Sequence, residues 1–320
     1  MDSSEIVIPF FPISPYYLIC PLISVISAFA VITLSILTGQ HKEPLGKMVI
    51  IILALDTIFC VPVIAAGHPY EKSGILCEVL IFIVHFGWEA SCIWSALFAY
   101  SLLNIIKNLT STSIENKMRW YMLAGLVFPL FHTVGAIFTD YVQYDSHMKQ
   151  CVHVAIPDKF DGSYFFVTSL PIIMCCFLSL VWYGMAAKHL KRIFSESKNS
   201  DVIILLLYPS IMILCWGPNV ILNSSIIFGQ SPDPTLIQLF QGICKLQGFF
   251  NAVVYGCSKK MLKEIRKLRY CRCLGNEKDI ELYRSFDNIE TEENNSKVSL
   301  QKGYLTSSEE RDASYQSFGY

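Results

Sequence analysis

Three ionisable side chains lie inside apolar stretches of this chain, where a charged group is stable only if the fold provides it with a partner. Asp56, Glu89 and Lys245 each have apolar runs on both sides. A charge at the centre of a bilayer costs roughly 2.5–3.5 kcal/mol on insertion scales, so such residues pair, line a wet cavity or bind a ligand. We expect these side chains to be candidates for pairing across a bundle, with Glu89 and Lys245 as the preferred pair.

The stretch that carries Lys245, from Leu236 to Tyr255, has one polar, small-residue face at helical spacing. The residues of that face are Gln238, Gln241, Gly242, Lys245, Gly248 and Ala252. This face must turn toward other helices or a cavity, because lipid cannot satisfy it. Lys245 has about ten residues on either side and cannot easily reach an interface, so we interpret it as functional. A lysine that only snorkels or pairs with a carboxylate is the alternative.

Nothing in the sequence points to an enzyme. His85 and Glu89 lie one helical turn apart, but two candidate ligands without a third are a weak metal signal, and no metal site is expected. The chain contains no HExxH, GxSxG or glycine-rich phosphate-binding motif. We therefore expect a protein that is not an enzyme.

The composition is that of a membrane protein. Of the 320 residues, 53% are hydrophobic and only 16% are charged, against about 25% charged in soluble domains. The net charge of −1 argues against nucleic acid as a partner. Seven apolar segments could each span a hydrocarbon core of roughly 30 Å. They are Tyr16–Leu37, Lys47–Ala66, Leu76–Ile106, Trp120–Thr139, Tyr164–Ala187, Val202–Phe228 and Leu236–Gly256. The predicted fold class is an all-α membrane protein with a seven-transmembrane helix bundle.

The short loops on the two sides of this bundle differ in charge, which predicts its orientation. The loops after the first, third and fifth segments carry Lys42, Lys47, Lys107, Lys117, Arg119, Lys188, Lys191, Arg192 and Lys198. The loops on the other side carry Lys72, Lys149 and Lys159. Because positive loops stay in the cytoplasm, we expect residues 1–15 to be a short extracellular N-terminus and residues 16–256 to be the bundle. The C-terminus is then cytoplasmic, and the plasma membrane is the expected location.

Residues 257–273 are expected to form an amphipathic cytoplasmic helix, the eighth of the fold. Its apolar stripe is surrounded by lysines and arginines, as in helices that lie along an anionic membrane surface. Cys271 and Cys273 near its end are candidate palmitoylation sites, with a solvated basic helix as the alternative. Residues 274–320 are polar and predict a disordered tail whose serines and threonines suit regulatory phosphorylation.

Two further features concern the outer side of the bundle and its sixth segment. Cys77 and Cys151 would both face the oxidising side, so we expect a disulfide that ties the loop after the fourth segment over the mouth of the bundle. Pro218 removes a backbone hydrogen bond and predicts a kink in the sixth segment, with Trp216 about half a turn before it.

Taken together, these residues resemble a G-protein-coupled receptor over roughly residues 15–273. The resemblance rests on the seven spans, the outside N-terminus, the Cys77–Cys151 pair, Asp56, Cys215-Trp216-Gly217-Pro218, Asn251–Tyr255 and the basic helix that ends in cysteines. The sequences LQGFFNAVVYG and WGPN, with Trp88 and Trp94, look most like the cyclic-AMP-receptor-like branch, known from slime mould chemoattractant receptors. That branch shares features with secretin-like receptors.

Two departures from the rhodopsin-like pattern favour this non-rhodopsin branch. The third segment ends in YSLLNIIKN and lacks the acidic–arginine–aromatic triplet, and Ala252 stands where rhodopsin-like receptors have a proline. By resemblance, Trp216 and Pro218 form the toggle of the sixth helix. Asp56, Asn251 and Tyr255 then form a polar relay toward the cytoplasmic face.

The resemblance implies a receptor that transduces an extracellular small-molecule signal, with a cyclic nucleotide as the leading ligand, to a heterotrimeric G protein. The expected ligand contacts are His85, Glu89, Trp216, Asn219, Gln241 and Lys245. Kinase and arrestin-like regulators are expected at the C-terminal tail, and membrane lipid is expected around the bundle. No cofactor is expected.

Two other functions remain open at this stage. Lys245 lies six residues before Asn251, the spacing at which opsins place the lysine that binds retinal, so a light receptor with retinal on Lys245 is the first alternative. An ion or proton transporter that uses Asp56, Glu89 and Lys245 as a relay is the second. The absence of visible internal repeats argues against a transporter.

Overall fold

The computed structural model describes residues 15–66, 74–108, 112–138, 142–145, 150–153, 169–193, 200–227, 233–258 and 261–265. The chain divides into two units, Met1–Leu262 and Lys263–Tyr320, and the bundle lies in the first. The predicted palmitoylation sites Cys271 and Cys273, the predicted tail 274–320 and most of the N-terminus fall outside the described residues. So do the side chains of Cys77 and Cys151.

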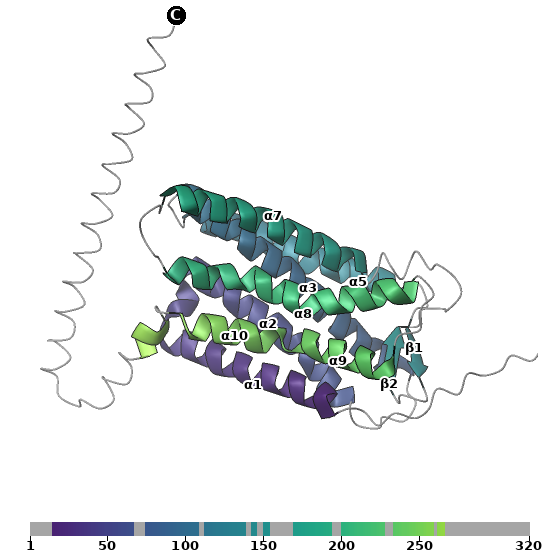
Figure 1. Cartoon of the computed structure of the whole chain (residues 1–320). Helices are drawn as coiled ribbons and strands as arrows, with labels where there is room; N and C mark the ends of the chain where they lie inside the picture. The colour runs from purple at the N-terminus through teal and green to yellow at the C-terminus, as the bar shows by residue number, and fades with distance from the viewer. Residues whose placement is uncertain are drawn as a thin grey trace, which may run out of the picture. The chain divides into compact units, whose positions relative to one another are not determined.

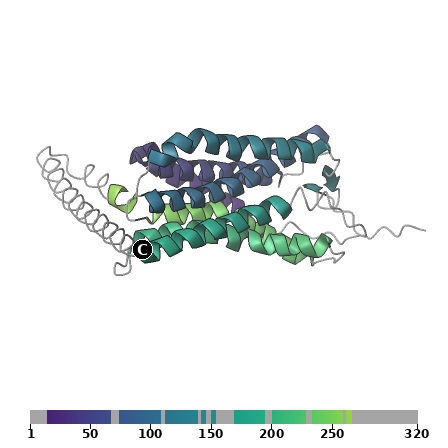
Figure 2. The same cartoon turned by 90° about the horizontal axis from the view of Figure 1, so that it is seen from above.

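The described part of the first unit is built mainly of long helices that run along one common direction, as Figure 1 and Figure 2 show. In chain order the elements are α1 (Pro15–Leu37), the short 3₁₀ helix η1 (Gln40–Lys42), α2 (Pro44–Ala66), α3 (Gly74–Asn108), α4 (Thr112–Met122), the π-helical segment η2 (Leu123–Val127), α5 (Phe128–Phe138), β1 (Val142–Asp145), β2 (Gln150–His153), α7 (Leu170–Ile193), α8 (Ser200–Ile227), α9 (Pro234–Lys245) and α10 (Gln247–Gly256).

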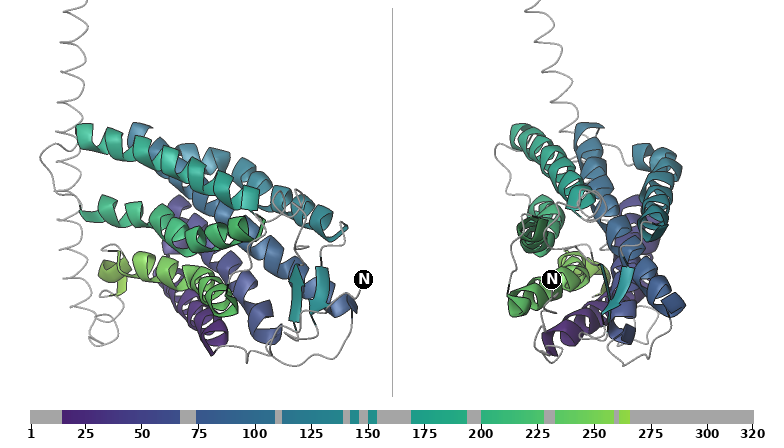
Figure 3. Two further views of the ribbon diagram at one scale, coloured as in Figure 1. Left: turned by 45° about the vertical axis from the view of Figure 1, so that its right-hand side comes forward. Right: turned by 90° about the vertical axis from the view of Figure 1, so that its right-hand side faces the viewer.

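A small hairpin is the part of the fold that the all-α prediction missed. Strands β1 and β2 pair antiparallel, with Val142 opposite His153 and Asp145 opposite Gln150. The hairpin packs against α3, at the end of the bundle where α3 begins (Figure 1, Figure 3). The sequence from Thr139 to Phe165 carried no strong alternating pattern, so periodicity did not reveal these four-residue strands.

Four of the described helices are long and apolar enough to cross a membrane. These spans are Leu18–Leu37, Pro44–Ile64, Val79–Lys107 and Leu170–His189. Large apolar side chains face outward from the bundle, among them Ile26, Phe29, Phe131, Leu214 and Ile221, each at least 60% exposed. An exterior of this kind suits hydrocarbon rather than water, which supports a helical membrane protein.

The last predicted span, Leu236–Gly256, is not one continuous helix. Helix α9 ends at Lys245, Leu246 adopts a tight turn, and α10 begins at Gln247. The two pieces have 12 and 10 residues. No proline or glycine marks the break at Leu246, so local sequence rules did not predict it.

Local sequence signals explain several other helix boundaries. Asp233 caps α9 by accepting a hydrogen bond from the Thr235 backbone N–H at 2.7 Å, and Pro234 occupies the first turn, where its missing N–H is tolerated. The turn after α1 uses Gly39 in the left-handed region, at φ 74°. Pro44 likewise opens α2, three residues before the predicted start at Lys47.

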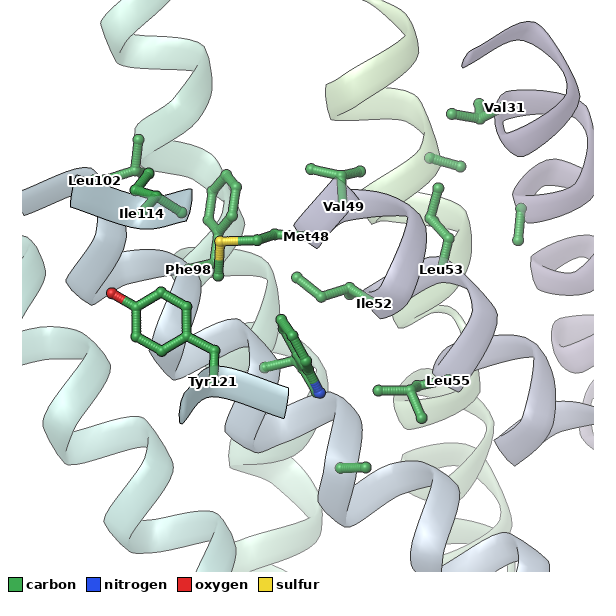
Figure 4. Packing of buried hydrophobic residues seen from close by; sticks show 14 residues of the cluster. Val31, Met48, Val49, Ile52, Leu53, Leu55, Phe98, Leu102, Ile114 and Tyr121 are labelled. Carbon is green, nitrogen blue, oxygen red and sulfur yellow. The ribbon is translucent and has the colours of Figure 1, made fainter. Parts of the chain in front are cut away.

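Two clusters of buried side chains hold the bundle together. The first, drawn in Figure 4, joins α1, α2, α3, α4 and α10 around Met48, Ile52, Leu53, Trp94 and Phe98. The second joins α2, α3, α7, α8 and α9 and has the ring of Trp216 among its members. Both clusters draw on α2 and α3, which together form the centre of the packing.

The contact between α2 and α3 depends on a glycine. A Cβ atom at Gly87 would lie 2.7 Å from the backbone nitrogen of Phe59 and 3.0 Å from its Cα. Backbone atoms of a packed helix cannot move aside as a flexible side chain can. The two helices can therefore approach this closely only where residue 87 has no side chain.

We predict that Gly87→Ala destabilises the bundle by about 1–3 kcal/mol, because the added methyl group forces α2 and α3 apart. The measurement is thermal unfolding of the purified protein in detergent. The matched control is Gly184→Ala on α7, where a Cβ meets nothing within 4 Å. That variant should stay within ~1 kcal/mol of the wild type. Equal unfolding temperatures for the two variants would contradict the close-packing argument.

Candidate functional site

The break at Leu246 turns α10 so that its first residues point into the bundle. Leu246 has φ −78° and ψ −4°, and its backbone N–H donates to the Ile243 carbonyl at 3.0 Å. Beside the break, the Cys60 thiol of α2 donates to the Lys245 carbonyl at 3.7 Å. The neighbouring helix thus helps to satisfy backbone acceptors that a continuous helix would bond internally.

Asp56 of α2 lies at the centre of a buried hydrogen-bond network. Its Oδ1 accepts from the Ser91 hydroxyl of α3 at 2.6 Å and from Gln247 Nε2 of α10 at 3.2 Å. Its Oδ2 accepts from Asn251 Nδ2 at 2.9 Å. Gln247 Nε2 also donates to the Ser91 hydroxyl at 2.9 Å. Because all four side chains are at most 2% exposed, each polar group depends on the others for its partners.

The network reaches α8 through Gln247. The indole N–H of Trp216 donates to Gln247 Oε1. Gln247 therefore connects α8 to the carboxylate of Asp56 while it is itself carried by α10. Side chains of four helices, α2, α3, α8 and α10, are joined in one chain of hydrogen bonds.

Helix α1 secures the start of α10. The backbone N–H of Phe249 lies in the first turn of α10, where no carbonyl of the same helix is available to it. It donates instead to the Ser24 hydroxyl of α1 at 2.9 Å. A Cβ at Gly248 would lie 2.7 Å from that hydroxyl oxygen and 3.0 Å from the Asp56 Cβ, so glycine allows the three helices to meet.

A row of aromatic rings continues from Trp216 toward the beginning of α3. The Trp216 ring lies 5.7 Å from the Phe59 ring and 5.3 Å from the Trp88 ring, measured between centroids. The His85 ring lies 5.5 Å from Trp88 in an edge-on arrangement. The Lys245 ammonium lies 5.9 Å from the Phe59 centroid, a distance at which a cation–π attraction operates.

The structure therefore connects several predicted ligand-binding residues. His85, Trp216 and Lys245 meet through Trp88 and Phe59. Gln241 lies one turn before Lys245, and its backbone carbonyl accepts from the Lys245 ammonium at 3.2 Å. Asn219 is half-buried on α8, in the helical turn that follows Trp216.

Glu89 has a different partner from the predicted one. Its Oε2 pairs with Nδ1 of His132 on α5 at 2.9 Å, so the expected Glu89–Lys245 pair is wrong. Glu89 lies on the side of α3 that faces α5, whereas Lys245 packs beside Phe59 and Cys60 of α2. Spacing along the chain did not distinguish these two sides, because both lie in the interior of the bundle.

Two residues of the predicted switch also have defined positions. Helix α8 continues through Pro218 from Ser200 to Ile227, so the structure shows no break in the helix at the predicted kink. Tyr255 lies one turn beyond Asn251, but it is not part of the Asp56 network. Its hydroxyl oxygen lies 3.2 Å from the position that a Cβ at Gly46 would occupy. Asp56 and Asn251 are brought together as predicted, and Tyr255 points toward the start of α2.

Neutral polar residues of the centre were missed by sequence reasoning, which weighed ionisable groups first. Gln247, Ser91 and Ser24 are each at most 2% exposed and supply most of the network's hydrogen bonds. A signal was present, since each interrupts an apolar stretch. Among the described residues, no group of three His, Cys, Asp or Glu side chains could hold a metal ion.

Comparison with known proteins gives a consistent family match. The sequence profile described as "7 transmembrane receptor (Secretin family)" matches residues 20–250. The calcitonin receptors of Rattus norvegicus and Mus musculus are each 22% identical over 195 residues, or 58% of this chain. The match covers 35% of the rat receptor and 34% of the mouse receptor, so the chain spans about a third of the length of these relatives.

We predict that Gln247→Leu destabilises the bundle by about 2 kcal/mol, because Asp56, Ser91 and Trp216 each lose a buried hydrogen-bond partner. Combined with Ser91→Ala in a double-mutant cycle, it should show a coupling energy of about 1 kcal/mol. Thermal unfolding in detergent is the measurement. Ser225→Ala is the control, since this exposed hydroxyl donates to a carbonyl of its own helix, that of Ile221, at 3.0 Å. Equal coupling of Gln247 to Ser91 and to Ser225 would contradict the network.

Proposed function

Because the chain belongs to the secretin family of seven-transmembrane receptors, we propose that it is a G-protein-coupled receptor that carries an extracellular signal to a heterotrimeric G protein. The observation that carries this proposal is the family match over residues 20–250, which includes Asp56, Gln247 and the aromatic row. A cyclic-AMP-receptor-like branch is the finer part of the proposal and rests on the sequence resemblance alone.

We further propose seven spans, with the N-terminus outside and the C-terminus in the cytoplasm of the plasma membrane. In this arrangement α4, η2 and α5 cross as one span, and α9 and α10 cross as another. The excess of lysine and arginine around the C-terminal ends of α1, α3 and α7 and at the start of the helices that follow them supports the orientation. The proposed Cys77–Cys151 disulfide would then lie outside, and the contact of β2 with α3 supports it.

The proposed ligand enters from the outer side and reaches the aromatic row. Lys245 is 5% exposed, and its ammonium lies beside the Phe59 ring. The Phe59 ring in turn packs against Trp216. A buried ammonium next to aromatic faces suits a flat ligand with an anionic group, such as a cyclic nucleotide. The relatives are named for calcitonin, so activation by calcitonin in place of a cyclic nucleotide would change this part of the proposal.

The proposed switch is a movement of α8 relative to α10. The Trp216 ring packs against Phe59 and Trp88, and its indole N–H donates to Gln247. A ligand that displaces these rings therefore also changes the hydrogen bonds of the Asp56 network. Such a ligand shifts the equilibrium only by its difference in affinity for two arrangements. Kinase and arrestin-like proteins acting on the C-terminal tail would then end the signal.

We predict that a cyclic nucleotide activates a G protein through this receptor and that Lys245→Gln weakens the response about tenfold, as expected for loss of a charge-assisted hydrogen bond. Nucleotide exchange on purified G protein, with the receptor in lipid, is the measurement. Lys47→Gln, an exposed lysine at the start of α2, is the control. Equal loss in the two variants would contradict a ligand contact at Lys245. A visible absorbance band after incubation with retinal, lost in Lys245→Gln, would instead establish the light-receptor alternative.

We also predict that Pro218→Ala impairs G-protein activation while ligand affinity stays unchanged, because the proline supplies the flexible joint of α8 without contacting the ligand. The comparison of binding and nucleotide-exchange curves measures this. Pro21→Ala in α1 is the matched control, since Pro21 is likewise inside a helix, but a different one from the helix that carries Trp216. Normal activation in Pro218→Ala would argue against the hinge.

A further inference from the structure

A second polar cluster lies far from the aromatic row, where the C-terminal half of α3 meets α4 and α7. We define this α3–α4 corner by Tyr100, Asn104, Lys117, Tyr121 and Trp182. The Tyr100 ring lies 6.4 Å from the Tyr121 ring and 5.1 Å from the Trp182 ring, so it joins the three helices. The Lys117 ammonium lies 5.5 Å from the Tyr100 ring centroid.

Two hydrogen-bond donors in this corner are buried and have no hydrogen-bond partner among the described residues. They are the Tyr121 hydroxyl and the Asn104 Nδ2. Tyr121 is only 5% exposed, and Figure 4 shows its hydroxyl on the side of the ring away from Ile52 and Val49. The Asn104 amide is a neighbour of the Tyr100 hydroxyl and interacts with it, so the Tyr121 hydroxyl is the clearer of the two cases. Buried donors are nearly always satisfied, so these two indicate a missing acceptor.

The charges around the corner indicate that the acceptor is an anion. Lys117 and Lys107 both act on the Tyr100 hydroxyl electrostatically. Among the described residues, no carboxylate forms an ion pair with Lys117. Glu115 lies two residues earlier on α4 and is exposed, so at about 100° per residue it points away from the corner. An ammonium, a phenol and an amide N–H₂ together suit the oxygens of a phosphate group.

The surface beside the corner is that of a helix facing lipid. On α4 and η2, Trp120 is 70% exposed, Met122 39% and Leu123 51%. Tryptophan prefers the level of the lipid headgroups, and the apolar residues that follow it would lie along acyl chains. Arg119, next to Trp120, is also exposed. Basic pockets between membrane helices on the cytoplasmic side bind the headgroups of anionic lipids.

We propose that the α3–α4 corner binds the phosphate headgroup of an anionic membrane lipid, with Lys117, Asn104 and Tyr121 as its donors and the lipid chains beside Trp120 and Leu123. A bound headgroup joins α3 to α4 and stabilises their packing against α7. This inference rests on the membrane location in the proposed function, but it needs neither the signalling ligand nor the G protein.

The test measures lipid binding to the full-length receptor and its thermal stability, first in phosphatidylcholine and then with phosphatidylinositol 4,5-bisphosphate added. Native mass spectrometry counts the bound lipids. We expect the anionic lipid to bind and to raise the unfolding temperature. Lys117→Gln should weaken binding about fivefold, the contribution expected from one lysine near an anionic lipid. Lys47→Gln, which removes an exposed charge from α2, is the matched control and should retain wild-type binding.

Tyr121→Phe gives the sharpest test, because it removes only the hydroxyl. In phosphatidylcholine alone the variant should be as stable as the wild type or more so, since that hydroxyl has no partner in the part of the chain that the structure describes. With the anionic lipid present, the variant should lose part of the stabilisation that the wild type gains. If Tyr121 acted only in packing, the effect of Tyr121→Phe on the unfolding temperature would have the same sign with and without the anionic lipid.

Two results would overturn the proposal. Equal binding and stabilisation in the wild type, Lys117→Gln and Tyr121→Phe would place the lipid elsewhere. Full stabilisation by soluble inositol phosphate in detergent, with no further gain from the intact lipid, would assign the corner to a free phosphate ligand. Because neither measurement uses an agonist or a G protein, failure here leaves the proposed receptor function intact, and failure of that function leaves the lipid-binding result readable.

Discussion

A carboxylate inside a membrane protein requires hydrogen-bond donors from its neighbours, and the centre of this bundle is arranged around that requirement. Asp56 receives Ser91 from α3 and both Gln247 and Asn251 from α10. Removing a donor takes a hydrogen bond from a buried carboxylate, and a buried polar group left without a partner costs more than the bond contributes when it is present. The relative positions of α2, α3 and α10 are therefore closely specified by one side chain.

The interruption of the helix at Leu246 follows from the same requirement. It places Gln247 where the amide can donate to Asp56 and accept from Trp216, so the network extends to α8. Ser24 then satisfies the first turn of α10, and Gly248 provides the space for α1 and α2 to meet it. An irregular backbone in the bilayer is tolerated here because neighbouring helices supply its hydrogen bonds.

The two carboxylates of the interior illustrate what sequence reasoning could and could not predict. Both Asp56 and Glu89 were expected to need partners, and both have them. The grouping of Asp56 with Asn251 was also predicted. The partner of Glu89 was not, since the expected partner was Lys245 and the structure pairs Glu89 with His132. Gln247 was not among the predicted site residues, because an uncharged amide costs less to bury than a charge and so gives a weaker sequence signal than the nearby Lys245.

The sequence by itself determined that the chain is a helical membrane protein and where most helices lie, because these properties depend on local composition and on spacing along one segment. Which side of each helix meets which neighbour was decided only by the tertiary structure. A turn of a helix carries polar groups on several sides, and the packing of α3 against α2, α5 and α7 selects among them. The break at Leu246 belongs to this second group, since its stabilising contacts come from residues nearly two hundred positions earlier, Cys60 and Asp56.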